Sequence, residues 1–194
     1  MSDIDRYSFL ANAVAGRRVG LTRAPEDDLL ASTDNRSITL PLLPQPGGRD
    51  SWCEVVAQAA LIAAGSLEAK FVRRLIGKPV PSRRYIYLEI LRASRLLAHR
   101  LPVAFLELPA LQSADSYTST AAESLTWALS KRTLPQTPAF FGRLRPFAIL
   151  RAALMDGGAG KLGNRQSSAQ FTERKPGEFD DDESAEDSKL LRQF

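Results

Sequence analysis

The sequence predicts a mainly helical α+β protein with five or six helices, a small amino-terminal two-stranded element and a disordered acidic tail. Apolar residues recur at three- and four-residue steps through most of the chain, which is the helical period. Two short runs near the amino terminus alternate in polarity, as half-buried strands do. From Gly160 onward apolar residues are scarce, so this part cannot bury enough surface to fold. We therefore expect a globular domain over 1–160 and a disordered acidic tail or linker over 161–194.

The amino-terminal part is predicted to hold one helix and then two strands. Ile4 to Arg17 has helical spacing of its apolar residues, and Gly16 is a suitable stop. The predicted strands are Arg18 to Arg23 and Ser37 to Leu43. Asp34-Asn35 lies between them and predicts a turn, because both residue types tolerate turn conformations.

The stretch Val55 to Leu67 predicts a central buried helix. From Val55 to Ala64 only Gln58 is polar, and a helix that is apolar on every face is a buried helix. Ser51 is a candidate amino-terminal cap, with Glu54 completing a capping box. Gly65 suits the left-handed position that ends a helix, and Ser66 is the candidate cap of the next one.

Further helices are predicted downstream. A short one follows Ser66 and ends at Gly77 and Pro79, and Val103 to Leu111 fits either a helix or a strand. The other predicted helices are Ser82 to Arg100, Thr120 to Lys131, and Pro146 to Met155, the last one stopped by Gly157-Gly158.

Charge divides the chain into two parts. The net charge of the whole chain is +4, but Gly163 to Phe194 holds eight acidic and five basic residues, so the rest carries +7. A basic body with an acidic tail suggests nucleic acid, an acidic partner, or shielding of the body by its own tail. Cys53 is the single cysteine and excludes an internal disulfide. We see no signal peptide and no apolar run of membrane-spanning length, so we expect a cytoplasmic protein with no membrane partner.

The segment Thr33 to Pro41, together with the helix after it, resembles a known family. It is similar to the amino-terminal region of bacterial von Willebrand factor A-domain proteins of the nitric-oxide-reductase-activation and cobaltochelatase-subunit type. The resemblance covers about Tyr7 to Leu97. It implies that the protein binds to, or acts in one complex with, an AAA+ ATPase of the chelatase type. The A domain itself is lacking, since its metal motif Asp-x-Ser-x-Ser has Tyr117 in place of a serine in the nearest string, Asp115 to Ser119.

The resemblance also argues against catalysis. Some relatives look like a metallopeptidase-like module whose helix carries two histidines four residues apart, where they share a zinc ion. The matching positions here are Ala57 and Leu61, which cannot bind a metal, and His99 is the only histidine in the chain. We therefore expect a degenerate module with no catalytic residue, no metal and no cofactor.

Arginines around the predicted helix Ser82 to Arg100 form the strongest remaining pattern, because guanidinium groups suit phosphate and carboxylate ligands. This candidate patch consists of Arg73, Arg74, Arg83, Arg84, Arg92, Arg95 and Arg100. A solvated or self-paired face, an acidic protein partner and nucleic acid all remain open for it. The leading expectation is a non-catalytic interaction module for an AAA+ ATPase or a von Willebrand A-domain subunit. The alternatives are a nucleic-acid-binding protein and, least favoured, a residual metal-dependent hydrolase.

Overall fold

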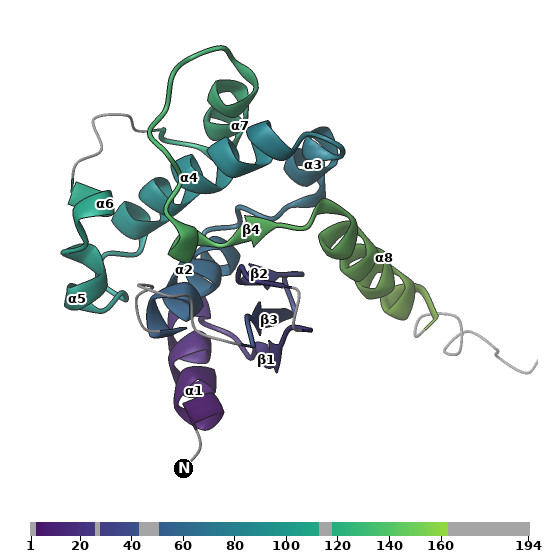
Figure 1. Cartoon of the computed structure of the whole chain (residues 1–194). Helices are drawn as coiled ribbons and strands as arrows, with labels where there is room; N and C mark the ends of the chain where they lie inside the picture. The colour runs from purple at the N-terminus through teal and green to yellow at the C-terminus, as the bar shows by residue number, and fades with distance from the viewer. Residues whose placement is uncertain (1–2, 26–27, 43–50, 113–117, 163–194) are drawn as a thin grey trace, which may run out of the picture.

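The computed structural model describes residues 3–25, 28–42, 51–112 and 118–162 of the chain. Within them are eight α-helices, two 3₁₀ helices and four short strands (Figure 1). The helices are α1 (Asp3–Ala15), α2 (Ser51–Ala63), α3 (Ala69–Val72), η1 (Arg73–Leu75), α4 (Pro79–Leu96), α5 (Val103–Leu106), α6 (Pro109–Gln112), α7 (Ala121–Leu129), η2 (Ala139–Phe141) and α8 (Pro146–Leu162). The strands are β1 (Gly20–Arg23), β2 (Ser32–Thr33), β3 (Ser37–Leu40) and β4 (Arg143–Leu144). None of these helices is both long enough and apolar enough to cross a bilayer.

Helix α2 is the centre of the molecule, as its apolar sequence predicts. Every residue from Cys53 to Ile62 is buried. The helix packs against α1, α4, β3 and η2, so all of its faces have neighbours (Figure 1). Helix α4 packs against α2 and α7, and the apolar residues Ile86, Ile90, Ala93 and Leu97, which recur at helical spacing, are buried. With eight α-helices and four strands among the described residues, the predicted mixed class of helices and strands is confirmed.

The sheet has four strands in the order β1-β3-β2-β4, whereas the sequence predicts two. Strands β1 and β3 are the two predicted ones, and they pair in parallel. The two missed strands are only two residues long. Strand β2 pairs antiparallel with β3, and β4 joins β2 in parallel through Ser32 and Arg143. Such short segments carry no alternation of their own, and the pairing of β4 with β2 joins residues far apart in the chain.

The turns around α2 and β3 follow the sequence closely, with one exception. Asn35 has φ +78° and Gly65 has φ +68°, which are the left-handed positions predicted for the turn and the helix end. Ser66 does not cap the next helix, because α3 begins at Ala69. Its carbonyl oxygen instead accepts a hydrogen bond from the hydroxyl of Tyr85 at 2.7 Å, so it ties the corner after α2 to α4.

The helix predictions need three corrections. The eight α-helices exceed the predicted five or six because the ambiguous segment Val103 to Leu111 gives rise to two four-residue helices, α5 and α6. Helix α4 begins at Pro79 rather than Ser82, since proline is well accepted in the first turn. Helix α8 continues through Gly157 and Gly158 to Leu162. Glycine costs only about 1 kcal/mol inside a helix, so it does not by itself stop one. The predicted tail lies outside the described residues, apart from 161 and 162.

Candidate interaction surface

Helix α8 exposes an apolar face to solvent. From Pro146 to Met155 the only charged residue is Arg151, and a helix segment of this composition is normally buried on all sides. Ile149 and Ala152 are buried, and α8 packs against α3 and η1. Phe147, Leu154 and Met155, by contrast, are 70%, 76% and 61% exposed.

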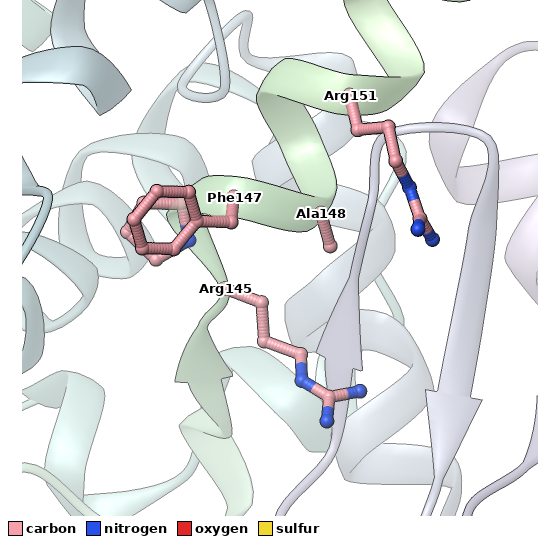
Figure 2. A pocket seen from close by; sticks show the side chains of 5 residues that line it. Arg145, Phe147, Ala148 and Arg151 are labelled. Atoms are coloured by element: carbon pink, nitrogen blue, oxygen red, sulfur yellow. The ribbon is translucent and has the colours of Figure 1, made fainter.

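The backbone positions of the exposed residues share one side of the helix, although the ring of Phe147 leans away from the side chain of Arg151 (Figure 2). At 3.6 residues per turn, Phe147, Arg151, Leu154 and Met155 fall within an arc of about 100°. We call these four residues the α8 stripe. They lie on α8, which extends away from the body in Figure 1. Large apolar side chains exposed together on one side of a helix are typical of a binding surface.

A pocket of about 520 Å³ lies at the start of the stripe and is lined by Arg145, Pro146, Phe147, Ala148 and Arg151. Figure 2 shows the side chains of Arg145 and Arg151 extending to the same side of α8, while the ring of Phe147 points the other way. The pocket therefore joins two guanidinium groups to the apolar stripe. This combination suits a partner that carries both carboxylates and apolar side chains.

A buried carboxylate holds one of these arginines in place. Oδ2 of Asp28 lies 2.5 Å from Nη2 of Arg143 and 3.3 Å from Nη2 of Arg145. The side chain of Asp28 is only 7% exposed. Its other oxygen, Oδ1, is buried and has no hydrogen-bond partner among the described residues. Asp28 is thus a positioning residue for Arg145, and two arginines share this one carboxylate.

Two arginines of the predicted patch lie beside α8. Arg73 and Arg74 are exposed and belong to η1, which contacts α8. They add positive charge beside α8.

Three other arginines of the predicted patch bind the carboxyl-terminal ends of neighbouring helices. Arg84 donates to the carbonyl oxygens of Trp127, Ser130 and Arg132 at the end of α7. Arg92 donates to the carbonyl of Ala64 at the end of α2, at 3.0 Å, and Arg100 donates to that of Ala13 in the last turn of α1, at 3.2 Å. Helix ends leave carbonyl groups without partners and carry partial negative charge, so a guanidinium stabilises them.

Arg83 and Arg95 complete the predicted patch, and both are exposed on α4. The seven arginines of the predicted patch therefore differ in exposure and in what they contact. Arg73, Arg74, Arg83 and Arg95 are exposed, while Arg84 and Arg92 are partly buried in internal contacts. Arg100 is exposed but donates to the backbone of α1.

One buried acid in α2 has an unusual environment. The side chain of Glu54 is 6% exposed, and its burial raises the pKa of the carboxyl from its ordinary value to about 7, although nearby Arg23 opposes the shift. Shifted carboxyl groups are common in active sites, but also inside cores. Glu54 lies on the central helix and does not line the pocket at α8.

The positions that match zinc ligands in the resembled family lie in the core. Ala57 and Leu61 are 0% and 1% exposed. Between them, Gln58 is fully buried, and its Nε2 donates to the carbonyl of Phe141 at 2.7 Å, which ties α2 to η2. Within the described ranges, no three His, Cys, Asp or Glu side chains are grouped closely enough to hold a metal ion.

Sequence reasoning missed the α8 stripe, although it located the helix. The apolar residues of Pro146 to Met155 give no sign of which of them face solvent. Comparisons with protein-family models, with curated proteins and with solved structures find no match to this chain.

Proposed function

We propose that this protein is a non-catalytic interaction module that binds a protein partner through the α8 stripe and the arginine-lined pocket beside it. The observation that supports this most is the exposure of Phe147, Leu154 and Met155, each above 60%, on a helix whose opposite face is buried. Leaving such side chains in water is unfavourable by roughly 25 cal/mol for each Å² of apolar surface. A partner that covers the stripe would recover this free energy.

The partner should be both acidic and apolar. Arg145 and Arg151 in the pocket, with Arg73 and Arg74 on the adjacent η1, favour carboxylates, and the stripe favours aliphatic or aromatic side chains. Because Thr33 to Pro41 and the helix after it resemble proteins that work with such assemblies, we propose a cytoplasmic partner of this kind: an AAA+ ATPase of the chelatase type or its von Willebrand A-domain subunit.

The nucleic-acid-binding alternative has less support. It needs a continuous arginine face, but Arg84, Arg92 and Arg100 donate to carbonyl groups of the protein itself. Phosphate contacts would require these side chains to leave the helix ends that they stabilise.

The test is isothermal titration of the full chain into each proposed partner. Phe147→Asp with Leu154→Asp should abolish binding, because the stripe would then carry charges of the wrong sign for an acidic partner. Phe9→Asp is the matched control, since Phe9 is 79% exposed on α1, away from α8 (Figure 1). Unchanged binding by the double variant, or equal loss in the control, would overturn the proposal.

A further inference from the structure

We propose that residues 178–194 of this same chain cover the α8 stripe in the free protein, so that a partner must displace them. This inference rests on the proposed function, since it names what occupies the same surface when no partner is bound. Three properties of residues 178–194 support this contact: their apolar side chains, their acidic charge and the length of chain that joins them to α8.

The chemistry of the segment matches that of the surface. Glu178 to Asp187 holds seven acidic residues in ten and no basic one. Phe179 lies within this run, and Leu190, Leu191 and Phe194 follow it. The segment therefore offers carboxylates for Arg145 and Arg151, and apolar side chains for Phe147, Leu154 and Met155. A guanidinium group donates two parallel hydrogen bonds to a carboxylate in a planar geometry.

The chain is long enough to make this contact. Helix α8 ends at Leu162, and its seventeen residues span about 26 Å at 1.5 Å per residue. The sixteen residues from Leu162 to Glu178 can extend to about 53 Å at most. The acidic run can thus return along the whole of α8 to the pocket at its start.

Covalent connection makes a weak contact sufficient. A segment joined to its binding surface by a short linker acts at an effective concentration of about 1 mM. With a millimolar intrinsic dissociation constant, the segment is therefore bound in about half of the molecules. The contact includes exposed charges, and salt screens such charges beyond about 8 Å at physiological ionic strength and at shorter range as the salt concentration rises. The covering is therefore a removable one, suited to displacement by a partner.

The test uses a nitroxide label on Ser188→Cys in the full chain. Labelling is selective because Cys53 is buried at 1% exposure. The amide signals of Phe147, Arg151 and Met155 should lose intensity by about twofold or more, and that of Phe9 should not. The effect should vanish at high salt and in Leu190→Asp with Leu191→Asp. Unaffected α8 signals, or equal loss at Phe9, would overturn the proposal. A mixing control uses isotope-labelled chains without a nitroxide together with nitroxide-labelled chains without the isotope. The same loss of signal in this mixture would also overturn the proposal, since the tail would then contact α8 of another molecule.

A second measurement separates this inference from the proposed function. Deleting residues 178–187 should raise the affinity for the partner by about two- to tenfold, since a competitor is removed. If the double variant of the stripe loses partner binding while the nitroxide leaves α8 unaffected, the docking surface stands and the covering by the tail is refuted. If the nitroxide affects α8 but the double variant still binds the partner, the covering stands and the proposed function fails.

Discussion

The guanidinium of Arg92 makes two hydrogen bonds to the carboxylate of Glu89 inside the protein. Nε lies 2.9 Å from Oε1, and Nη2 lies 2.6 Å from Oε2. The side chain of Glu89 is fully buried, and that of Arg92 is 10% exposed. This hydrogen bonding raises the pKa of Arg92 and keeps it charged. Since Nη2 of Arg92 also donates to the carbonyl of Ala64, the pair fastens the end of α2 to α4.

Arg92→Ala should therefore destabilise the protein strongly. It leaves the carboxylate of Glu89 buried without its partner, and breaking such a pair costs about 3–5 kcal/mol. Urea denaturation measures the loss in the free energy of unfolding. Arg83→Ala is the matched control, because Arg83 is exposed on the same helix and should change stability by no more than about 0.5 kcal/mol. Equal effects of the two substitutions would contradict this role of Arg92.

Gly142→Ala should also be destabilising. Gly142 has φ +75°, and a Cβ there would lie 2.3 Å from the carbonyl oxygen of Ala31 and 2.6 Å from Nε2 of Gln58. Strain and overpacking together should cost about 3 kcal/mol or more. Gly77→Ala isolates the strain, since Gly77 has φ +69° but open space around it. It should cost only about 1–2 kcal/mol. Thermal unfolding of the two variants compares them, and a smaller effect at Gly142 would refute the close packing.

Glu54 predicts a pH dependence of stability. Its pKa is raised to about 7 by burial, so the folded state favours the protonated carboxyl. The stability that comes from this group is fully present below about pH 4.5 and is lost as the pH rises through 7. At pH 8, Glu54→Gln should raise the free energy of unfolding by up to about 3 kcal/mol, at 1.36 kcal/mol per pKa unit. The exposed Glu107 provides the control Glu107→Gln. Parallel pH profiles for Glu54→Gln and the unaltered protein between pH 4.5 and 7 would contradict the prediction.

Leu61→Asp tests the central position of α2. Leu61 is 1% exposed, and an unpaired charge at such a site costs several kcal/mol, which is a large part of the 5–15 kcal/mol that stabilises a typical domain. We expect an unfolded or aggregated product in circular dichroism and gel filtration. Leu96→Asp is the control, because Leu96 is 56% exposed on α4 and should tolerate the charge. A folded Leu61→Asp with an unchanged melting temperature would show that the core lies elsewhere.

The sequence predicts α2 and α4 well because their signals are local. Ten successive buried residues from Cys53 to Ile62, and the stripe from Ile86 to Leu97, are visible in apolar spacing alone. Strands β2 and β4 are not predictable in this way. Each has only two residues. Strand β2 pairs with β3 across the local turn at Asp34-Asn35, but β4 exists only because β2, from a distant part of the chain, lies beside it.

The candidate site is only partly predictable for a related reason. The sequence shows which residues are arginines, but the acceptors of Arg84 and Arg100 are backbone carbonyls, which every residue possesses. The α8 stripe is hidden as well, since Leu154 at 76% exposure and Ile149 at 1% are equally apolar in the sequence. Only the packing of α8 against α3 and η1 separates the two faces.

Amide hydrogen exchange of the full chain, with and without the bound partner, tests the central claim most directly. Residues 146–155 of α8 should exchange more slowly in the complex, and η1 beside them should show partial protection, while α1 around Phe9 should not change. Protection confined to the arginine-bearing face of α4 around Arg83 and Arg95, with none on α8, would contradict the account and favour the nucleic-acid-binding alternative.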